Sequence, residues 1–300
     1  MMREKLDFFG IIKEAIKLPF KNLNFIIVFI ALLPFFCFFL LHEIIFQHNL
    51  IQALTFMSHS SRCYNIFSCY GKLIGKISPK NLISFLSLVG FVHLVDLLNT
   101  IITVSTASAI YLEDQDPMNL KDLITKSMKK VSFKGPLITS ICALLLTSLT
   151  LIGLLTLSIN FYVSIFVFFK ILYGLLFLAF ITKYMEWTAI WNMGLVISIL
   201  EENKHGDVAL GVSAYLSRGS RKRGSLLELM FSGWSFGLRL LCISVGWRNR
   251  GSKNVIEVIA AHVCLDCIWN VMKWVVFVIY YYDCKKRFLE KKFDGAEGRP

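Results

Sequence analysis

Residues 135–169 read GPLITSICALLLTSLTLIGLLTLSINFYVSIFVFF, a run of 35 residues without a formal charge. About 20 apolar residues are enough for a helix to cross the ~30 Å hydrocarbon core of a bilayer, because an α-helix satisfies its own backbone polar groups as it rises. A second run without charged residues covers residues 22–41. These stretches predict an all-α fold, a polytopic transmembrane helix bundle.

The composition excludes a water-soluble globule. Of the 300 residues, 56% are hydrophobic and 26 are phenylalanine, which leaves too little polar surface to face water. The net charge of +12 comes from short basic clusters beside apolar spans, so anionic lipid headgroups are the expected counter-charge and nucleic acid is not. Residues 1–21 are charged and amphipathic, and we expect no removal of a secretory signal.

Hydropathy divides the chain into an N-terminal amphipathic helix at 1–21, a bundle of about six spans within 22–284 and a basic tail at 285–300. Asn160 is read as a polar break between the third and fourth spans, and the fourth is the least certain. Its apolar extension at 187–200 is either an interfacial helix or part of one long bent span. The six predicted spans are about 23–41, 82–112, 135–158, 161–182, 226–247 and 258–282.

Orientation follows from the basic residues on alternating sides of these spans. With a cytosolic N-terminus, 22 Lys and Arg residues fall in the inner segments and 7 in the outer loops. The positive-inside rule therefore predicts both termini in the cytosol, in the plasma membrane or an endomembrane, with an outer loop at 42–81.

The N-terminal stretch has apolar residues at helical spacing. Leu6, Phe9, Ile12, Ile16 and Phe20 recur every three or four residues, with lysines elsewhere around the helix. Such a helix either lies in the headgroup layer or packs on the loops of its own bundle. We expect Pro19 to mark the bend into the first span.

Residues 200–224 read LEENKHGDVALGVSAYLSRGSRKRG and carry a loose pattern of an acidic residue, Gly, Ala-Leu, Ser, Leu, Gly and basic residues. The chain resembles a plant family of six-span integral membrane proteins without assigned activity. It is more distantly similar to the membrane domain attached to some bacterial glycerophosphodiester phosphodiesterases. In those relatives hydrolysis resides in a separate soluble domain for which this chain has no room. The resemblance therefore argues against an esterase.

The same segment predicts a short amphipathic helix after Gly206, with Ala209, Leu210, Ser213 and Leu216 on its inner face. The basic residues that follow are placed to contact anionic headgroups, at ~1 kcal/mol per charge. The alternative is a basic loop that only fixes topology. These candidate headgroup contacts are Arg218, Arg221, Lys222 and Arg223.

Charges inside a span cost ~2.5–3.5 kcal/mol each on insertion scales, so each needs a partner or a wet cavity. In this chain they form stripes on the second, fifth and sixth predicted spans. The candidate intramembrane polar site consists of His93, Asp96, Glu228, Arg239, Asp266, Asn270 and Lys273.

Depth suggests two ion pairs between the fifth and sixth spans. If these spans are antiparallel neighbours, Arg239 lies level with Asp266 near the outer half. Glu228 then lies level with Lys273 near the inner boundary. These polar groups either bond one another and lock the bundle, or line a path or site for a solute.

Other motifs are weaker. Gly233 and Gly237 form a G-x-x-x-G that could allow close helix packing, although such spacings are frequent by chance. The C-x-x-C at 264–267 lies inside a span rather than in a zinc loop. Cys63 and Cys69 could form a disulfide in an oxidising lumen, and Cys284 is either palmitoylated or unmodified.

No cofactor or metal motif and no catalytic constellation is found, so we expect a non-enzymatic protein acting through lipid or protein contacts. Protein partners or self-association are compatible with this reading. The alternative is a carrier or channel for a small solute that uses the polar stripes. A lipid enzyme with His93 and Asp96 as an acid–base pair ranks third, because no nucleophile or metal set completes it.

Overall fold

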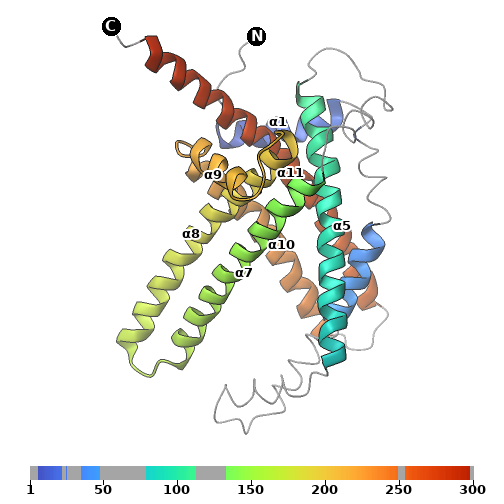
Figure 1. Cartoon of the computed structure of the whole chain (residues 1–300). Helices are drawn as coiled ribbons and strands as arrows, with labels where there is room; N and C mark the ends of the chain where they lie inside the picture. The colour runs from blue at the N-terminus through green and yellow to red at the C-terminus, as the bar shows by residue number, and fades with distance from the viewer. Residues whose placement is uncertain are drawn as a thin grey trace. The chain divides into compact units, whose positions relative to one another are not determined.

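The computed structural model describes residues 6–21, 25, 35–47, 79–112, 133–248 and 254–297. The regular elements in these ranges are helices, as the sequence predicts (Figure 1). A helix also covers Phe35–Gln47. The labelled helices are α1 (Phe8–Lys21), α5 (Pro79–Leu112), α7 (Lys134–Val163), α8 (Val167–Leu200), α9 (Asp207–Leu216), α10 (Arg221–Arg248) and α11 (Asn254–Glu297).

Within the described ranges, five helices are long and apolar enough to cross a membrane. This confirms an all-α membrane protein with multiple spans. The first predicted span, 23–41, falls largely outside the described residues and stays a prediction, as does most of the loop at 42–81 with Cys63 and Cys69. The spanning segments are Ser87–Leu112, Lys134–Val163, Val167–Leu200, Arg221–Val245 and Val255–Glu290.

The boundary between the third and fourth spans differs from the prediction. α7 continues through Asn160 to Val163, and the turn is made by residues 164–166. α8 then runs without a break to Leu200, about 50 Å at ~1.5 Å per residue. The extension at 187–200 is therefore part of one long helix, because no proline interrupts it and its backbone hydrogen bonds continue.

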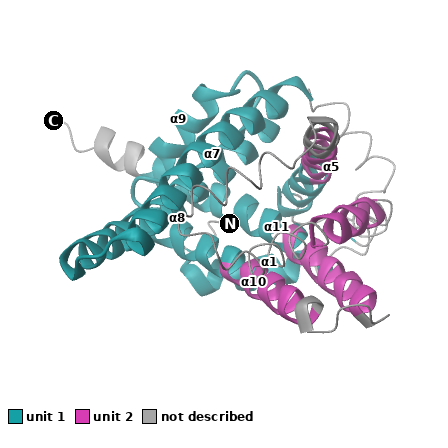
Figure 2. Ribbon diagram, turned by 90° about the horizontal axis from the view of Figure 1, so that it is seen from below, with its two compact units in different colours: residues 1–26, 100–232, 271–300 teal, residues 27–99, 233–270 magenta. Residues whose placement is uncertain are grey.

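The chain divides into two compact units, whose boundaries fall inside α5, α10 and α11 (Figure 2). Unit 1 comprises residues 1–26, 100–232 and 271–300, and unit 2 comprises 27–99 and 233–270. In unit 1, α8 packs against both α7 and α9. A Cβ at Gly194 would lie 2.7 Å from Leu210 Cδ2 and 3.4 Å from its Cα, so the glycine permits this close approach of α9 to α8.

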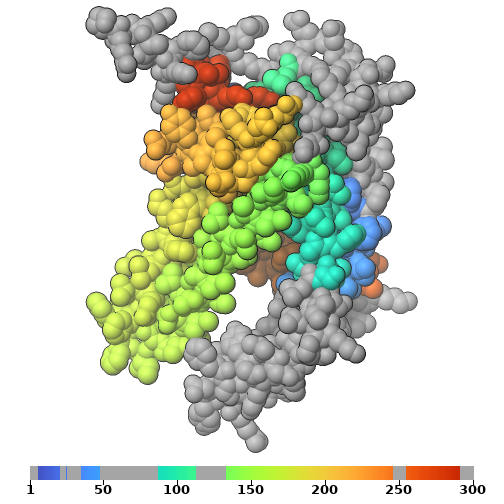
Figure 3. All heavy atoms as spheres, in the orientation of Figure 1, coloured from blue at the N-terminus to red at the C-terminus, as the bar shows by residue number. Residues whose placement is uncertain are grey.

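The hairpin of α7 and α8 has two kinds of surface. Figure 3 draws the hairpin in green to yellow-green. Its turn and the adjoining halves of both helices expose large apolar side chains, such as Ile165 at 89% and Phe168 at 72%. Surface of this kind is expected to face acyl chains. The second half of α8 is buried instead, with Met193, Val196 and Ile197 fully inaccessible. The two ends of this long helix therefore have different environments.

Unit 2 has a small core of its own. Cys242 of α10 packs with Ile259 and Val263 of α11, all of them buried. Phe36, Phe39, Leu40 and Ile44 of the helix Phe35–Gln47 pack against them. This packing brings polar side chains at the end of that helix next to α10 and α11.

Candidate functional site

Glu228 on α10 is a buried carboxylate of the predicted polar site. It is 2% exposed and accepts hydrogen bonds from Asn192 Nδ2 at 2.8 Å and Ser232 Oγ at 2.9 Å. The ammonium of Lys273 on α11 lies 3.5 Å from the same carboxylate. The predicted Glu228–Lys273 pair is thereby confirmed, and α8 contributes a donor to it that the sequence did not indicate.

The second predicted pair is wrong. Arg239 on α10 does not contact Asp266. Its Nη2 atom lies 3.1 Å from Oε2 of Glu43, on the helix Phe35–Gln47, and its guanidinium lies over the Phe46 ring. Asp266 accepts a hydrogen bond from Ser235 Oγ at 2.8 Å instead. The physical reason is that this helix continues past the predicted end of the first span and brings an acid to Arg239.

Glu43 belongs to a buried polar group in unit 2. Its carboxylate accepts a hydrogen bond from Gln47 Nε2 at 3.1 Å, and the His262 ring lies 3.9 Å away. Gln47 Nε2 also contacts Cys242 Sγ at 3.0 Å. Among the described residues, Gln47 Oε1 and His262 Nδ1 are buried without a hydrogen-bond partner. The Gln47 side-chain carbonyl oxygen could therefore accept one more hydrogen bond, and the Nδ1 atom of His262 could make another.

Asp96 on α5 also has a partner inside unit 2. Asn270 Nδ2 on α11 donates to Asp96 Oδ1 at 2.8 Å. The structure thus brings together two members of the predicted site that the sequence placed on different spans. His93 and Asp96 both make further interactions.

The seven residues of the candidate polar site are divided between the two compact units. Glu228 and Lys273 belong to unit 1, whereas the others belong to unit 2. Within each unit the hydrogen bonds and ion pairs above join six of these side chains, those other than His93, to neighbours on other helices. This arrangement matches the locking interpretation at least as well as a lining for a solute path.

The four candidate headgroup contacts differ in their surroundings. Arg218 and Lys222 are exposed, and Arg218 lies over the ring of Tyr215. Arg221 lies 3.6 Å from Glu186. Arg223 is turned inward, so the prediction of a headgroup contact is retained for Arg218 and Lys222 and is not supported for Arg223.

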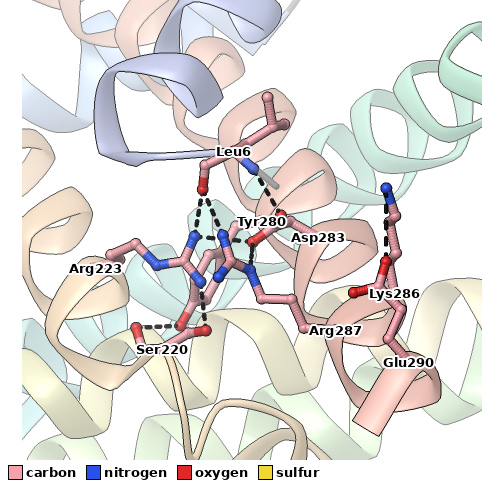
Figure 4. Close-up of polar contacts among 8 residues, drawn as sticks. All are labelled: Leu6, Ser220, Arg223, Tyr280, Asp283, Lys286, Arg287 and Glu290. Carbon is pink, nitrogen blue, oxygen red and sulfur yellow. Dashed lines mark hydrogen bonds and ion pairs between the residues drawn. The ribbon is translucent and has the colours of Figure 1, made fainter. Parts of the chain in front are cut away.

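Arg223 is held in a cluster around Asp283 of α11 (Figure 4). Its Nη1 atom lies 2.9 Å from Asp283 Oδ2, and Nε of Arg287 donates to the same oxygen at 2.8 Å. Both guanidinium groups also donate to the backbone carbonyl of Leu6, at 2.6 and 2.9 Å. The amide of Leu6 donates to Asp283 Oδ1 at 3.2 Å. The segment before α1 is therefore fastened to α10 and α11.

A second acidic residue, Glu201, lies directly after α8. Its carboxylate contacts Lys204 at 2.6 Å and Lys285 at 2.7 Å, and it accepts a hydrogen bond from the hydroxyl of Tyr281. Burial by itself would raise the pKa of Glu201, but hydrogen bonds from these three side chains outweigh that effect and lower its pKa to about 2. Glu201 is thus ionised at neutral pH and ties the end of α8 to α11.

The short helix after Gly206 is confirmed as α9. Gly206 has φ of 58°, and its amide donates a hydrogen bond to Thr139 Oγ1 at 2.8 Å. Ala209 and Ser213 are fully buried, as the pattern predicts. Ser213 Oγ donates to the carbonyl of Ile190 at 2.6 Å, which fastens α9 to α8.

A family model described as a domain of unknown function, DUF8558, matches residues 2–294. The chain belongs to this family. The match covers nearly all of this DUF8558 chain, and the described helices lie within it except for the last three residues of α11. No curated protein and no solved structure matches it.

The G-x-x-x-G and C-x-x-C motifs of this DUF8558 protein do not form a packing or metal site among the described residues. A Cβ at Gly233 or Gly237 would meet no atom within 4 Å among the described residues, so neither glycine mediates close helix packing there. The thiols at 264 and 267 are free, and the described residues contain no group of three potential metal ligands. Cys284 is 1% exposed, which leaves its thiol shielded.

Proposed function

We propose that this protein is a non-enzymatic component of the membrane that acts through contacts with lipid and with other proteins. The observation that carries the proposal is the bonding of Glu228, which holds donors from α8, α10 and α11 at once. A carboxylate saturated in this way has little capacity left for a substrate. Buried polar groups that satisfy one another specify how helices pack in lipid.

The proposal includes an orientation and a location. Both termini lie in the cytosol, which the 22-to-7 split of basic residues supports. With residues 23–41 as a further span, the protein crosses the plasma membrane or an endomembrane six times. The resemblance to the six-span plant family supports this number. Exposed Arg218 and Lys222 then contact anionic headgroups at the cytosolic surface, and homo-oligomers or protein partners assemble with the bundle.

Purified protein reconstituted into liposomes tests the proposal. We expect efflux of protons, small ions and small organic solutes at the rate of empty vesicles, and bound anionic lipid in the purified sample. Asp96→Asn and Asp266→Asn serve as matched variants, because each removes a charge but keeps an acceptor oxygen. The contact role would be overturned if the wild-type protein showed a flux and either variant, although folded, lost that flux.

One observation favours the alternative of a carrier or channel. Buried Gln47 Oε1 and His262 Nδ1 lack partners among the described residues and lie beside the charged pair of Glu43 and Arg239. Such unused polar atoms could hold a small polar solute. If this alternative holds, Gln47→Leu and His262→Phe each abolish a flux that the wild-type protein shows.

A further inference from the structure

α1 has two apolar faces rather than one. Ile11, Ala15 and Leu18 lie on one side, at 0%, 0% and 5% exposure. Phe9, Ile16 and Phe20 lie on the opposite side and are exposed. At about 100° per residue these three fall within about 40° of one another, which makes a narrow stripe along the helix. We name Phe9, Ile16 and Phe20 the outer stripe.

The buried inner face consists of residues outside the apolar pattern predicted from the sequence, which includes Phe9, Ile16 and Phe20 of the outer stripe. A single apolar face is compatible with two placements of α1, in the headgroup layer or packed on its own bundle. The structure buries the inner residues and leaves the outer stripe exposed. Pro19 lies inside α1, which continues to Lys21, and the predicted bend into the first span falls outside the described residues.

The rotation of α1 about its axis is set by the cluster in Figure 4. Arg223 and Arg287 both hold the carbonyl of Leu6, and Asp283 holds its amide. Leu6 lies two residues before the start of the helix. With this end fastened, the outer stripe points away from the residues that α1 packs on.

Charge and chain position indicate what the outer stripe meets. α1 carries three lysines and one glutamate, and exposed Lys13 and Lys17 flank the stripe on one side. Lys17 also lies 3.0 Å from Glu14. The helix ends at Lys21, directly before the first predicted span. An apolar stripe with flanking lysines next to a membrane entry point suits the boundary between headgroups and acyl chains of an anionic leaflet.

We propose that the outer stripe of α1 inserts into the cytosolic leaflet, with Lys13 and Lys17 selecting anionic lipid. This rests on the proposed function and names the lipid-contact surface within it. The fastened Leu6 pre-orients the helix, so insertion requires no rearrangement of the bundle. The structure therefore contains a rigid surface anchor in addition to its membrane spans.

Photo-crosslinking in the full chain tests this. Benzoylphenylalanine replaces Phe9 or Phe20, and Glu14 on the other side of α1 is the control position. The protein is reconstituted into vesicles of phosphatidylcholine mixed with phosphatidylserine and irradiated, and adducts are identified by mass. We expect lipid adducts at Phe9 and Phe20 but not at Glu14. We also expect the ratio of phosphatidylserine to phosphatidylcholine among the adducts to be about fivefold the bulk ratio, the factor equivalent to ~1 kcal/mol for one charge near the surface.

The double variant Lys13→Gln/Lys17→Gln should return the adduct ratio to the bulk composition while lipid adducts persist. The insertion would be overturned if benzoylphenylalanine at positions 9 and 20 gave no lipid adducts, or if it gave covalent protein dimers instead. Bulk lipid ratios in the wild-type protein would overturn the anionic selection. The flux measurements above do not depend on α1, so failure of this inference is distinguishable from failure of the proposed function.

Discussion

The guanidinium of Arg239 on α10 lies 3.1 Å from the carboxylate of Glu43, and both belong to unit 2. Glu43 is 4% exposed, whereas the arginine side chain is 46% exposed. The buried partner therefore bears most of the desolvation cost. Loss of Arg239 leaves an acid without its cation next to Gln47 and His262.

A double-mutant cycle between Glu43→Gln and Arg239→Gln tests this contact. We expect a coupling free energy of about 0.2–1 kcal/mol, because one partner is half exposed. The control cycle between Asp266→Asn and Arg239→Gln should give no coupling. Unfolding is followed in detergent for both cycles. Coupling to Asp266 in place of Glu43 would restore the pairing predicted from helix depth.

Low pH should weaken the attachment of α8 to α11. The pKa of Glu201 is lowered to about 2 in the folded protein, whereas the unfolded value is about 4.5. The stabilisation by this carboxylate is therefore complete above pH ~4.5 and is lost as the pH falls towards 2. We expect the difference in unfolding free energy between wild type and Glu201→Gln to shrink across this window. A difference that stays constant with pH would contradict the assigned hydrogen bonds.

Gly224 permits close packing of α10 on α11. A Cβ there would lie 2.7 Å from the hydroxyl oxygen of Tyr280, which donates to the carbonyl of Ser220 and is buried. We expect Gly224→Ala to lower the free energy of unfolding by about 1–3 kcal/mol, as other overpacked sites do.

Gly211→Ala in α9 is the matched control for Gly224→Ala. No atom lies within 4 Å of its Cβ position among the described residues, and alanine favours a helix over glycine by about 0.5–1 kcal/mol. Denaturant unfolding of both variants should therefore shift in opposite directions. Equal effects would mean that Tyr280 moves aside freely.

The predictable parts of this fold follow from long uncharged runs. The helix containing 135–158 is deducible from its uncharged run. The pairing of Glu228 with Lys273 is deducible because antiparallel neighbours place residues of equal depth together. The boundary at Asn160 was wrong because a lone amide can hydrogen-bond within a helix without ending it. Hydropathy registers polarity, whereas helix ends depend on backbone hydrogen bonds.

The contacts that were missed involve side chains outside the predicted spans. Hydropathy places Glu43 in the outer loop at 42–81 because the uncharged run ends before it, although the helix continues to Gln47. Asn192 lies in the extension at 187–200, beyond the predicted fourth span, and a lone amide in an apolar stretch is the available signal. The inward turn of Arg223 was not predictable, since a basic run reads the same whether its side chains meet Asp283 or water.

The central claim is that charges within the spans stabilise the bundle by pairing with one another. A double-mutant cycle between Glu228→Ala and Lys273→Ala, measured by unfolding in lipid bicelles, tests it most directly. We predict that each single variant is destabilised and that the double variant loses less than their sum, with a coupling of about 0.6–1.7 kcal/mol. Purely additive effects would contradict the claim.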